Sequence, residues 1–302
     1  MDNLSFEGRR VIVTGAGRGI GREYALLLGS RGAQVAVVDL GANTDGSGIE
    51  GDSPAHEVVA EIEAVGGKAI AVQADVSTES GARSIVRTTV EAFGGVDGLI
   101  NNAGIIRVAP WDEVPLEEYQ RHLNVHYFGS LLLTKEAWTH LKESGTGRVV
   151  NTISAAMLGN PMLAHYGGSK GAVFGLTRNL ALEGASDGIL VNAVAPGAGG
   201  TRMADATSAA LPPEIVEYMR TALLPELVAP MGAYLVHPSC GVTGEVFNVA
   251  GGFVNRMAIV NSAGFHDPGL TVETIASRFD EVMAMPEGSQ VQVVAIPEVP
   301  AS

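Results

Sequence analysis

A tyrosine and a lysine four residues apart, Tyr166 and Lys170, are the pair in this sequence whose types and spacing could do chemistry. Residues at i and i+4 share one face of a helix, so the two side chains would lie together if segment 164–183 is helical. The phenol of free tyrosine has a pKa of about 10 and is a poor base at neutral pH. A neighbouring ammonium group favours the phenolate. The pair could therefore take a proton from a hydroxyl group while a hydride leaves the adjoining carbon.

A glycine-rich turn near the N-terminus supplies a candidate phosphate site. It lies between a short apolar run, residues 11–14, and a helix-period segment, residues 21–30, and it reads Thr14-Gly15-Ala16-Gly17-Arg18-Gly19-Ile20-Gly21. This glycine spacing allows a tight turn at Gly15, backbone approach to a pyrophosphate at Gly19 and close helix packing at Gly21. The amino end of the helix would then face the phosphates with free amides. The turn predicts a dinucleotide site.

Asp39 and Arg18 bear on which dinucleotide is bound. Asp39 ends the second apolar run, where an acid can hydrogen-bond the adenosine ribose, and a carboxylate there repels a 2′-phosphate. Arg18 could instead form an ion pair with that phosphate. Asp39 favours NAD as the cofactor and Arg18 leaves NADP as the alternative.

These candidate residues need elements to position them, and the chain alternates short Val/Ile-rich runs with longer helix-period segments. The expected strands are 11–14, 35–39, 69–73, 98–101, 149–153, 189–193 and 245–249. The expected helices are 21–30, 55–65, 80–93, 116–141, 164–183, 213–224 and 272–283. Several of the strands show no polar alternation, which is typical of strands buried on both faces of a parallel sheet. The pattern predicts an α/β fold with a Rossmann-type, doubly wound parallel sheet.

Composition narrows the class of protein. In 302 residues, 46% are hydrophobic and 17% charged, with a net charge of −14, which argues against nucleic acid or an anionic membrane as a partner. The single cysteine, Cys240, excludes an internal disulfide framework and suits a reducing compartment. No apolar run is long enough to span a membrane, and the N-terminus lacks the apolar core of a signal peptide. We expect a cytoplasmic protein.

The chain is expected to form one dinucleotide-binding domain, residues 1–253, followed by an extension, residues 254–302. The extension is short and thinly apolar, so we expect it to pack on the same domain rather than to fold alone. A Gly- and Asp-rich segment, residues 41–54, is expected to be an irregular loop after the second strand.

Taken together, the motifs resemble those of the classical short-chain dehydrogenase/reductase family. The resemblance runs from about Glu7 to Phe253, with the glycine turn, Asn101-Asn102-Ala103-Gly104, the Tyr166/Lys170 pair, and Pro196-Gly197 with Thr201 in the family's order. It implies an oxidoreductase in which Ser154 holds the substrate oxygen and Asn124 relays protons through water to the lysine. The spacing between Ser154 and Tyr166 is one residue shorter than is usual in the family, so the sequence predicts the orientation of the Ser154 side chain less well than that of Tyr166.

The same resemblance implies the remaining cofactor contacts. Asp75 and Val76 would flank the adenine, and Thr201 would contact the nicotinamide amide. The cofactor would also be lined by Asn102, Ala103, Gly104, Pro196 and Gly197. His122 and His126, at i and i+4, are spaced like metal ligands, but no third ligand accompanies them and hydride transfer needs no metal. No metal site is expected.

Four segments resemble one branch of the family, the (3R)-hydroxyacyl-CoA dehydrogenase domains of peroxisomal multifunctional enzymes type 2. They are the glycine-rich loop 41–54 and residues 136–150, 195–203 and 228–257. This resemblance implies a 3-hydroxyacyl-CoA thioester as substrate, in lipid or sterol side-chain β-oxidation. Four arginines in loops or segments could bind its phosphates or be ordinary surface residues: Arg107, Arg202, Arg220 and Arg256.

Two other functions stay open at this point, together with the state of assembly. One is a steroid or general carbonyl reductase that uses NAD or NADP, and the other is a dinucleotide-sensing module without turnover. Glycines at 167, 168, 171 and 175 would let the helix that carries Tyr166 approach a second copy closely, as the resemblance to the family implies, or would give the cofactor room. We therefore expect a homo-oligomer, a tetramer or a dimer.

Overall fold

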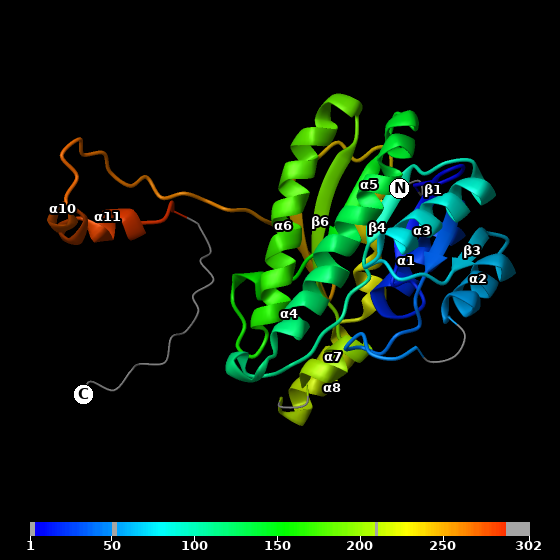
Figure 1. Ribbon diagram of the computed structural model, residues 1–302, viewed down its shortest axis with the longest axis horizontal. Helices are drawn as coiled ribbons and strands as arrows, with labels where there is room; N and C mark the ends of the chain where they lie inside the picture. Colours follow the sequence, from blue (N-terminus) through cyan, green and yellow to red (C-terminus); the bar gives the residue numbers. More distant parts are fainter. Residues whose placement is uncertain (1–3, 50–52, 209–210, 288–302) are drawn as a thin grey trace. The chain divides into compact units, whose positions relative to one another are not determined.

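A computed structural model of the chain describes residues 4–49, 53–208 and 211–287. Its strands form one sheet in the order β3-β2-β1-β4-β5-β6-β7-β8 (Figure 1). The strands are β1 (Arg10–Thr14), β2 (Gln34–Val38), β3 (Lys68–Val72), β4 (Gly98–Asn101), β5 (Arg148–Thr152), β6 (Leu190–Gly197), β7 (Val246–Ala250) and β8 (Phe253–Met257). The pairings from β3 across to β7 are all parallel. The predicted doubly wound α/β fold is confirmed.

The central strands are made of residues that suit burial on both faces. Val11, Ile12 and Val13 of β1 are all fully buried, and their branched side chains pack well on a pleated surface. The chain places β2 and β3 on one side of β1 and β4 to β7 on the other. The order of strands thus reverses between β1 and β4, and a crevice opens there at the carboxyl ends of the strands.

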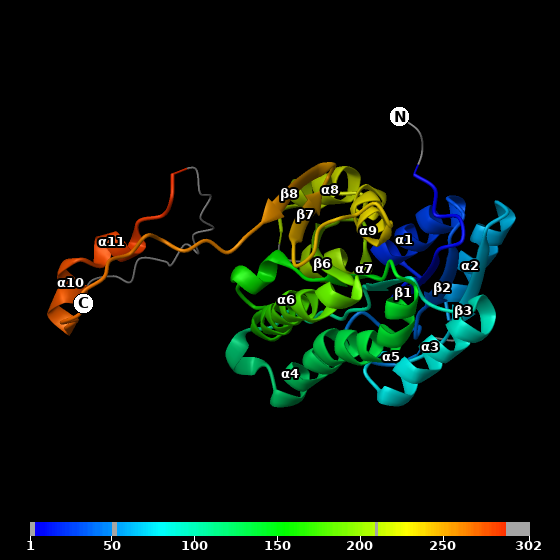
Figure 2. The same ribbon diagram turned by 90° about the horizontal axis from the view of Figure 1, so that it is seen from above.

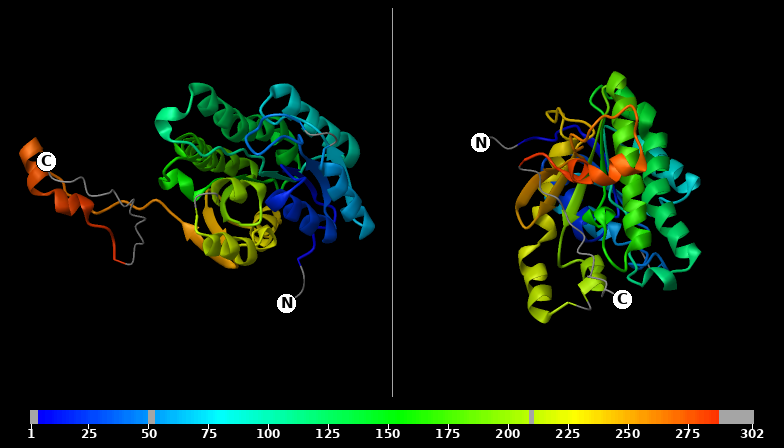
Figure 3. Two further views of the ribbon diagram at one scale, coloured as in Figure 1. Left: turned by 90° about the horizontal axis from the view of Figure 1, so that it is seen from below. Right: turned by 90° about the vertical axis from the view of Figure 1, so that its left-hand side faces the viewer.

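Helices cover both faces of this sheet, as Figure 2 shows from above and Figure 3 (left) from below. The α-helices are α1 (Gly19–Ser30), α2 (Ala55–Ala64), α3 (Glu79–Phe93), α4 (Leu116–Leu123), α5 (Gly129–Glu143), α6 (Ala164–Gly184), α7 (Arg202–Ser208), α8 (Pro213–Ala222), α9 (Ala229–Val236), α10 (Val272–Ser277) and α11 (Phe279–Met283). One apolar core lies under α1, α2 and α9 and includes Tyr24, Ile62 and Leu235. The other lies under α3, α5 and α6 and includes Ile85 and Leu133.

Local signals fix the ends of the helices. Thr78 precedes α3, and its hydroxyl accepts a hydrogen bond from the Gly81 N–H at 3.0 Å, a cap that stabilises a helix by about 1 kcal/mol. Gly94 ends the same helix with φ of 83°, in the left-handed region that glycine adopts at little cost.

A buried hydrogen-bond network attaches α5 and α6 to the sheet. The Asn101 amide on β4 donates to the Thr134 hydroxyl on α5 at 3.1 Å and to the Asn151 carbonyl oxygen on β5 at 2.9 Å. The Asn151 amide in turn donates to the Thr177 hydroxyl on α6 at 2.9 Å. Because a buried polar group left without a partner costs about 1–3 kcal/mol, this network specifies how α6, which carries Tyr166, lies on the sheet.

The predicted helix 116–141 differs most from the observed structure. It comprises α4, a π-helical turn (η2, Asn124–Phe128) and α5, and the turn closes with the Gly129 N–H donating to the Asn124 carbonyl. Shorter elements went unpredicted: β8, α7 and α9. Among the described helices, none has the length and apolar character required to cross a membrane.

The chain divides into two compact units, Met1–Arg256 and Met257–Ser302. In the second unit the predicted helix 272–283 consists of α10 and α11, which are separated at Arg278. The Thr271 hydroxyl caps α10 by accepting from the Thr274 N–H at 3.1 Å. That the extension packs on the dinucleotide-binding domain stays a prediction.

Candidate active site

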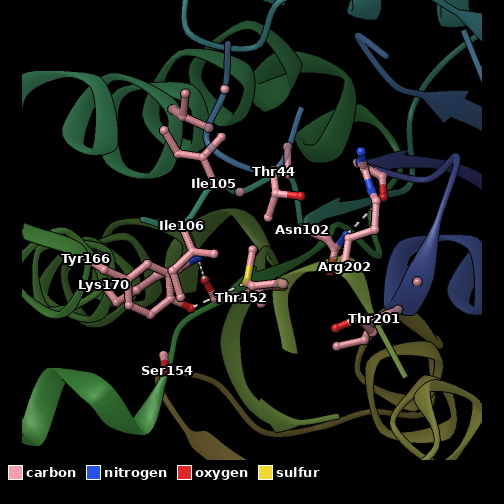
Figure 4. A pocket seen from close by; sticks show the side chains of 18 of the residues that line it. Thr44, Asn102, Ile105, Ile106, Thr152, Ser154, Tyr166, Lys170, Thr201 and Arg202 are labelled. Carbon is pink, nitrogen blue, oxygen red and sulfur yellow. Dashed lines mark hydrogen bonds between the residues drawn. The ribbon is translucent and has the colours of Figure 1, made fainter. Parts of the chain in front are cut away.

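One cavity of about 1040 Å³ occupies the crevice at the carboxyl ends of the strands. It is lined by nearly every residue that the sequence predicted for the site: Gly15, Arg18, Gly19, Ile20, Asp39, Asp75, Val76, Asn102, Ala103, Gly104, Asn124, Ser154, Tyr166, Lys170, Pro196, Gly197 and Thr201. Gly17 and Gly21 lie in the same turn but are not lining residues. Figure 4 shows Tyr166 and Lys170 in one part of this cavity and Thr201 with Arg202 in another.

The glycine turn has the tight geometry that its spacing predicts. Gly15 has φ of 61°, and a Cβ placed on it would lie 2.9 Å from the Ala103 Cα. A Cβ on Gly21 would collide with the Gly15 carbonyl oxygen. No side chain caps α1, so the amides of its first turn remain available to a ligand in the cavity.

Asp39 organises the turn as well as facing the cavity. One oxygen of its carboxylate accepts from the Gly17 N–H at 2.9 Å and the other from the Gly41 N–H at 2.8 Å. Each oxygen keeps a second lone pair, so the carboxylate can still accept a bond from a ribose hydroxyl. The same acid therefore connects the glycine turn to the loop after β2.

That loop, residues 41–49, forms one wall of the cavity and has more structure than its composition predicts. Ala42 and Ile49 pair in an isolated antiparallel bridge. The Thr44 carbonyl accepts from the Ile106 N–H at 2.9 Å, and the Asp45 carbonyl accepts from Arg121 at 3.4 Å. Thr44 consequently lies beside Ile105 and Ile106 (Figure 4).

Asn102, which directly follows β4, is hydrogen-bonded to the glycine turn. Its side-chain amide donates to the carbonyl oxygens of Thr14 at 3.0 Å and Gly15 at 3.3 Å. The Thr14 hydroxyl accepts in return from the N–H groups of Asn102 and Ala103, both at 3.0 Å. Part of the predicted cofactor-binding motif thus serves to hold the two central strands together at the floor of the cavity.

Tyr166 and Lys170 lie on α6 where the sequence predicts them, and both are buried, with exposures of 7% and 3%. The Lys170 ammonium donates to the Thr152 carbonyl at 2.8 Å, a bond drawn in Figure 4, and lies 5.8 Å from the centre of the Tyr166 ring. Burial lowers the pKa of Lys170 to about 7. Burial also raises the pKa of Tyr166, and the nearby Ser154 hydroxyl offsets part of that rise. The Tyr166 hydroxyl itself donates to the Met203 sulfur at 4.0 Å.

The predicted role of the Lys170 ammonium, to favour the phenolate of Tyr166, stays a prediction. In this structure burial has the largest effect on the pKa values of both Tyr166 and Lys170. Burial disfavours a charged group, so it raises the pKa of the phenol and lowers that of the ammonium.

Ser154 lines the same cavity as Tyr166 despite the shortened step between them. It lies directly after β5 and caps a 3₁₀ turn, η3 (Ala155–Leu158), where its hydroxyl accepts from the Ala156 N–H at 3.2 Å. The chain then returns to α6 through Met162, whose φ of 63° is unusual for a residue other than glycine. The short loop thus keeps both residues at the cavity, and Met162 adopts a strained backbone conformation within it.

Asn124 lines the cavity but its side chain is exposed, and it begins the π-helical turn. His126, two residues later, is instead buried against the Tyr166 ring, with ring centres 5.5 Å apart. Sequence reasoning considered His126 only as a metal ligand. The described residues contain no group of three or more His, Cys, Asp or Glu side chains arranged to hold a metal ion.

The part of the cavity next to Tyr166 is largely apolar and includes Ile106, Leu163 and Met203. Of the four arginines considered for phosphate binding, only Arg202 lines the cavity. Arg202 itself donates to the Ala42 carbonyl at 3.4 Å. The other three each have an acidic partner: Arg107 with Glu118, Arg220 with Glu217 and Arg256 with Glu245. The position beside the phenol thus suits an apolar alcohol or ketone.

The comparisons with known proteins agree with this geometry. The model of the short chain dehydrogenase family matches residues 9–212. The chain belongs to this family. It is 42% identical over 91% of its length to a protein of Mycobacterium tuberculosis named as a short-chain type dehydrogenase/reductase, and it covers 94% of that protein. It is 41% identical over 92% of its length to peroxisomal multifunctional enzyme A of Dictyostelium discoideum, of which it spans 61%.

Solved structures show the same fold. A short chain dehydrogenase from Mycobacterium avium superposes with a TM-score of 0.75 at 34% identity, covering 92% of this chain and 97% of that one. Two further family members were solved with different cofactors. A 7α-hydroxysteroid dehydrogenase with NADH has a TM-score of 0.72 at 31% identity, covering 83% of this chain and 98% of that one. A Burkholderia cenocepacia enzyme with NADP has a TM-score of 0.70 at 34% identity, covering 82% and 98%.

Members of this family bind a nicotinamide dinucleotide, and the residues present fit one. The uncapped amides of α1 can receive a pyrophosphate. Gly19 has φ of 55°, and a Cβ there would lie 3.4 Å from the Thr201 side chain, so a side chain would narrow the passage between the turn and the loop after β6. The protein is an oxidoreductase that acts on CH–OH groups.

Proposed function

We propose that the protein is an NAD-dependent dehydrogenase that interconverts a 3-hydroxyacyl-CoA and its 3-oxoacyl-CoA. The observation that carries the proposal is the continuous cavity, with Asp39 in the half beside the glycine turn and Tyr166, Ser154 and Lys170 beside an apolar half. The resemblance to the peroxisomal multifunctional enzymes supports the choice of thioester. Arg202, at the cavity wall, is the arginine placed to meet a phosphate of such a substrate.

Each proposed role follows from the position of the side chain. A bound nicotinamide supplies the carbon that accepts the hydride. Ser154 would hold the substrate oxygen, and Tyr166 would accept the hydroxyl proton in oxidation and return it in reduction. Lys170, fixed by the Thr152 carbonyl, would place its ammonium beside the phenol. We keep Asn124 as the proposed proton relay because it lines the cavity.

The decisive experiment follows NADH absorbance with NAD and a series of 3-hydroxyacyl-CoA thioesters, from short chains to steroid-sized ones. We expect turnover that Tyr166→Phe reduces by about 10²–10⁴-fold, the usual contribution of a general acid–base group. Tyr234→Phe, at a half-exposed tyrosine on α9, is the matched control and should leave turnover unchanged. If Tyr166→Phe turns over as fast as the parent protein, the proposal is contradicted. Cofactor binding without turnover on any alcohol would favour a sensing module.

A second candidate is a steroid or general carbonyl reductase, with NAD or NADP. The apolar lining beside Tyr166 and the presence of Arg18 at the cavity wall favour it, and one solved relative is a hydroxysteroid dehydrogenase. Activity on free steroids or ketones, with none on any thioester, would replace the CoA assignment and keep Tyr166 in its role.

We also propose that the protein works as a homo-oligomer, a tetramer or a dimer, in the cytoplasm. Gly168 and Gly175 of α6 have nothing within 4 Å of an added Cβ, and Leu182, seven residues further along, is 79% exposed. A second copy of α6 could pack closely on this face. Sedimentation velocity would test the assembly, and a monomer at micromolar concentration would contradict it. Cell fractionation would test the location.

A further inference from the structure

Three buried histidines lie around Tyr166, on the side away from the cavity lining. The rings of His122 and His126 meet that of Tyr166 edge to face, with centres 6.5 and 5.5 Å away, and His165 contacts His122 at 4.5 Å. His126 is 1% exposed and comes from the π-helical turn η2. Of the three, it is the one whose two ring nitrogens are both hydrogen-bonded outside its own helix.

The partners of His126 connect two walls of the active site. Its Nε2 accepts from the backbone N–H of Ile105, in the loop after β4, at 3.0 Å. Its Nδ1 lies 2.7 Å from the Ser169 hydroxyl on α6. The Ser169 hydroxyl lies 2.7 Å from the Tyr166 carbonyl. Ile105 and Tyr166 both line the cavity, so this chain of bonds runs from one wall to the other behind the lining.

Two independent contacts fix the same tautomer of His126. A backbone N–H can only donate, so the Nε2 that faces Ile105 carries no proton. A carbonyl oxygen can only accept, so Ser169 gives its single proton to Tyr166 and accepts from Nδ1. The ring is therefore neutral with its proton on Nδ1. A protonated ring would direct a second N–H at the Ile105 amide.

The surroundings favour this neutral ring. Burial lowers the pKa of His126 well below its ordinary value, and the nearby Lys170 ammonium acts in the same direction, as would any charge on His122 or His165. Gly104 leaves the room that the ring needs, because a Cβ there would lie 3.1 Å from Nε2. A Ser169-to-Tyr166 bond within one helix is common by itself. The link through a histidine to the cofactor-side loop is the unusual part.

We infer that His126 is a positioning residue: as the Nδ1-protonated tautomer it joins the Ile105 loop to the Ser169–Tyr166 turn of α6 and so fixes the phenol relative to the cofactor side of the cavity. The inference rests on the proposed function for its effect on turnover. It predicts that the ring acts through Tyr166 and contacts neither substrate nor cofactor.

Turnover of the full chain tests this role. His126→Phe keeps the ring shape but removes both bonds, and we expect kcat to fall by about 100-fold, the effect of a misplacement of about 1 Å, with KM little changed. His126→Gln should restore most of the loss, because its amide offers one donor and one acceptor. His122→Phe is the matched control, since His122 Nδ1 bonds only the Glu118 carbonyl of its own helix. An equal loss in that control, or no loss in His126→Phe, overturns the inference.

Ser169→Ala gives a second test that does not depend on how well His126→Phe folds. It interrupts the same chain, so it should lower kcat to a similar extent, and the double variant with His126→Gln should be no worse than Ser169→Ala alone. Independent, additive losses would show that the two residues do not act as one unit.

A spectroscopic test needs no substrate and so separates this inference from the proposed function. The ¹⁵N chemical shifts of the His126 ring in the cofactor-free protein should show a proton on Nδ1 only at neutral pH. Both histidine rings contact Tyr166, but the Tyr166 ring resonances should move further in His126→Phe than in His122→Phe. A proton on Nε2, or unmoved Tyr166 resonances, contradicts the inference even if the protein turns over another substrate.

Discussion

The two halves of the cavity are held in shape by different kinds of groups. Around the glycine turn the contacts are made by main chain: Gly17 and Gly41 amides on Asp39, and the carbonyl oxygens of Thr14 and Gly15 on Asn102. Around Tyr166 the contacts are made by buried side chains that can gain or lose protons. The first half depends on residue size and spacing, whereas the second depends on protonation state. Substitutions should therefore impair the first half by steric clash and the second half by a change of charge or protonation.

The largest expected effect is in the half that depends on protonation. Lys170→Met should lower kcat by about 10²–10⁴-fold, because it removes the ammonium beside the phenol. Folding stability should stay the same or rise, since a buried ammonium is replaced by an apolar chain of similar length. Lys135→Met, at an exposed position on α5, is the control. Turnover and thermal denaturation measured on the same samples would check both parts, and an equal loss in both variants would contradict the prediction.

In the half beside the glycine turn, substitutions should act through steric clash instead. Gly21→Ala places a methyl group against the Gly15 carbonyl and should destabilise the fold by about 1–3 kcal/mol and weaken dinucleotide binding. Gly175→Ala, in the open middle of α6, should instead stabilise a monomer by up to about 1 kcal/mol. Chemical denaturation together with cofactor titration would check the pair. Equal stability of the two variants would show that the turn relaxes around the methyl group.

Asp39 allows a finer test of the same half. Asp39→Asn keeps one acceptor for the Gly17 and Gly41 amides and removes the negative charge. We expect the ratio of the NADP to the NAD dissociation constant to fall by about tenfold, or about 1.4 kcal/mol. Asp187→Asn, which breaks an ion pair with Lys142, is the control. Calorimetric titration would measure the ratio, and tighter NADP binding by the parent would overturn the preference for NAD.

The last prediction concerns stability rather than turnover, and it is a pH dependence of folding due to Lys170. Its pKa is about 7 in the folded protein against an ordinary value of 10.5. Between these values the unfolded chain binds a proton that the folded chain does not, so raising the pH favours folding. The stability advantage of Lys170→Met should be full below pH 7 and should shrink as the pH rises toward 10.5. A constant difference across that window would contradict the burial of a titrating ammonium.

The two halves also differ in how far the sequence predicts them. Glycine spacing and a strand-terminal acid have a steric meaning that can be inferred without coordinates, and Gly15, Gly21 and Asp39 lie as predicted. The Tyr166–Lys170 pair can be predicted equally well, because residues at i and i+4 share a helix face. The role of the His126–Ser169 link is not, because it joins segments 43 residues apart and depends on a π-helical turn that no composition rule indicates. The order within loop 41–49 likewise comes from its partners Ile106 and Arg121.

The π-helical turn determines in which direction the side chains of α5 point relative to those of α4. His126 must face Ser169 within the turn, and Thr134, after it, must face Asn101 on the sheet. In a regular α-helix each residue advances the side-chain direction by about 100°. Deleting one residue between Val125 and Phe128 would restore regular bonding, but it would rotate one of these contacts away while keeping the other. The length of this segment is therefore fixed by two separate partners, and the chain cannot satisfy both with one residue fewer.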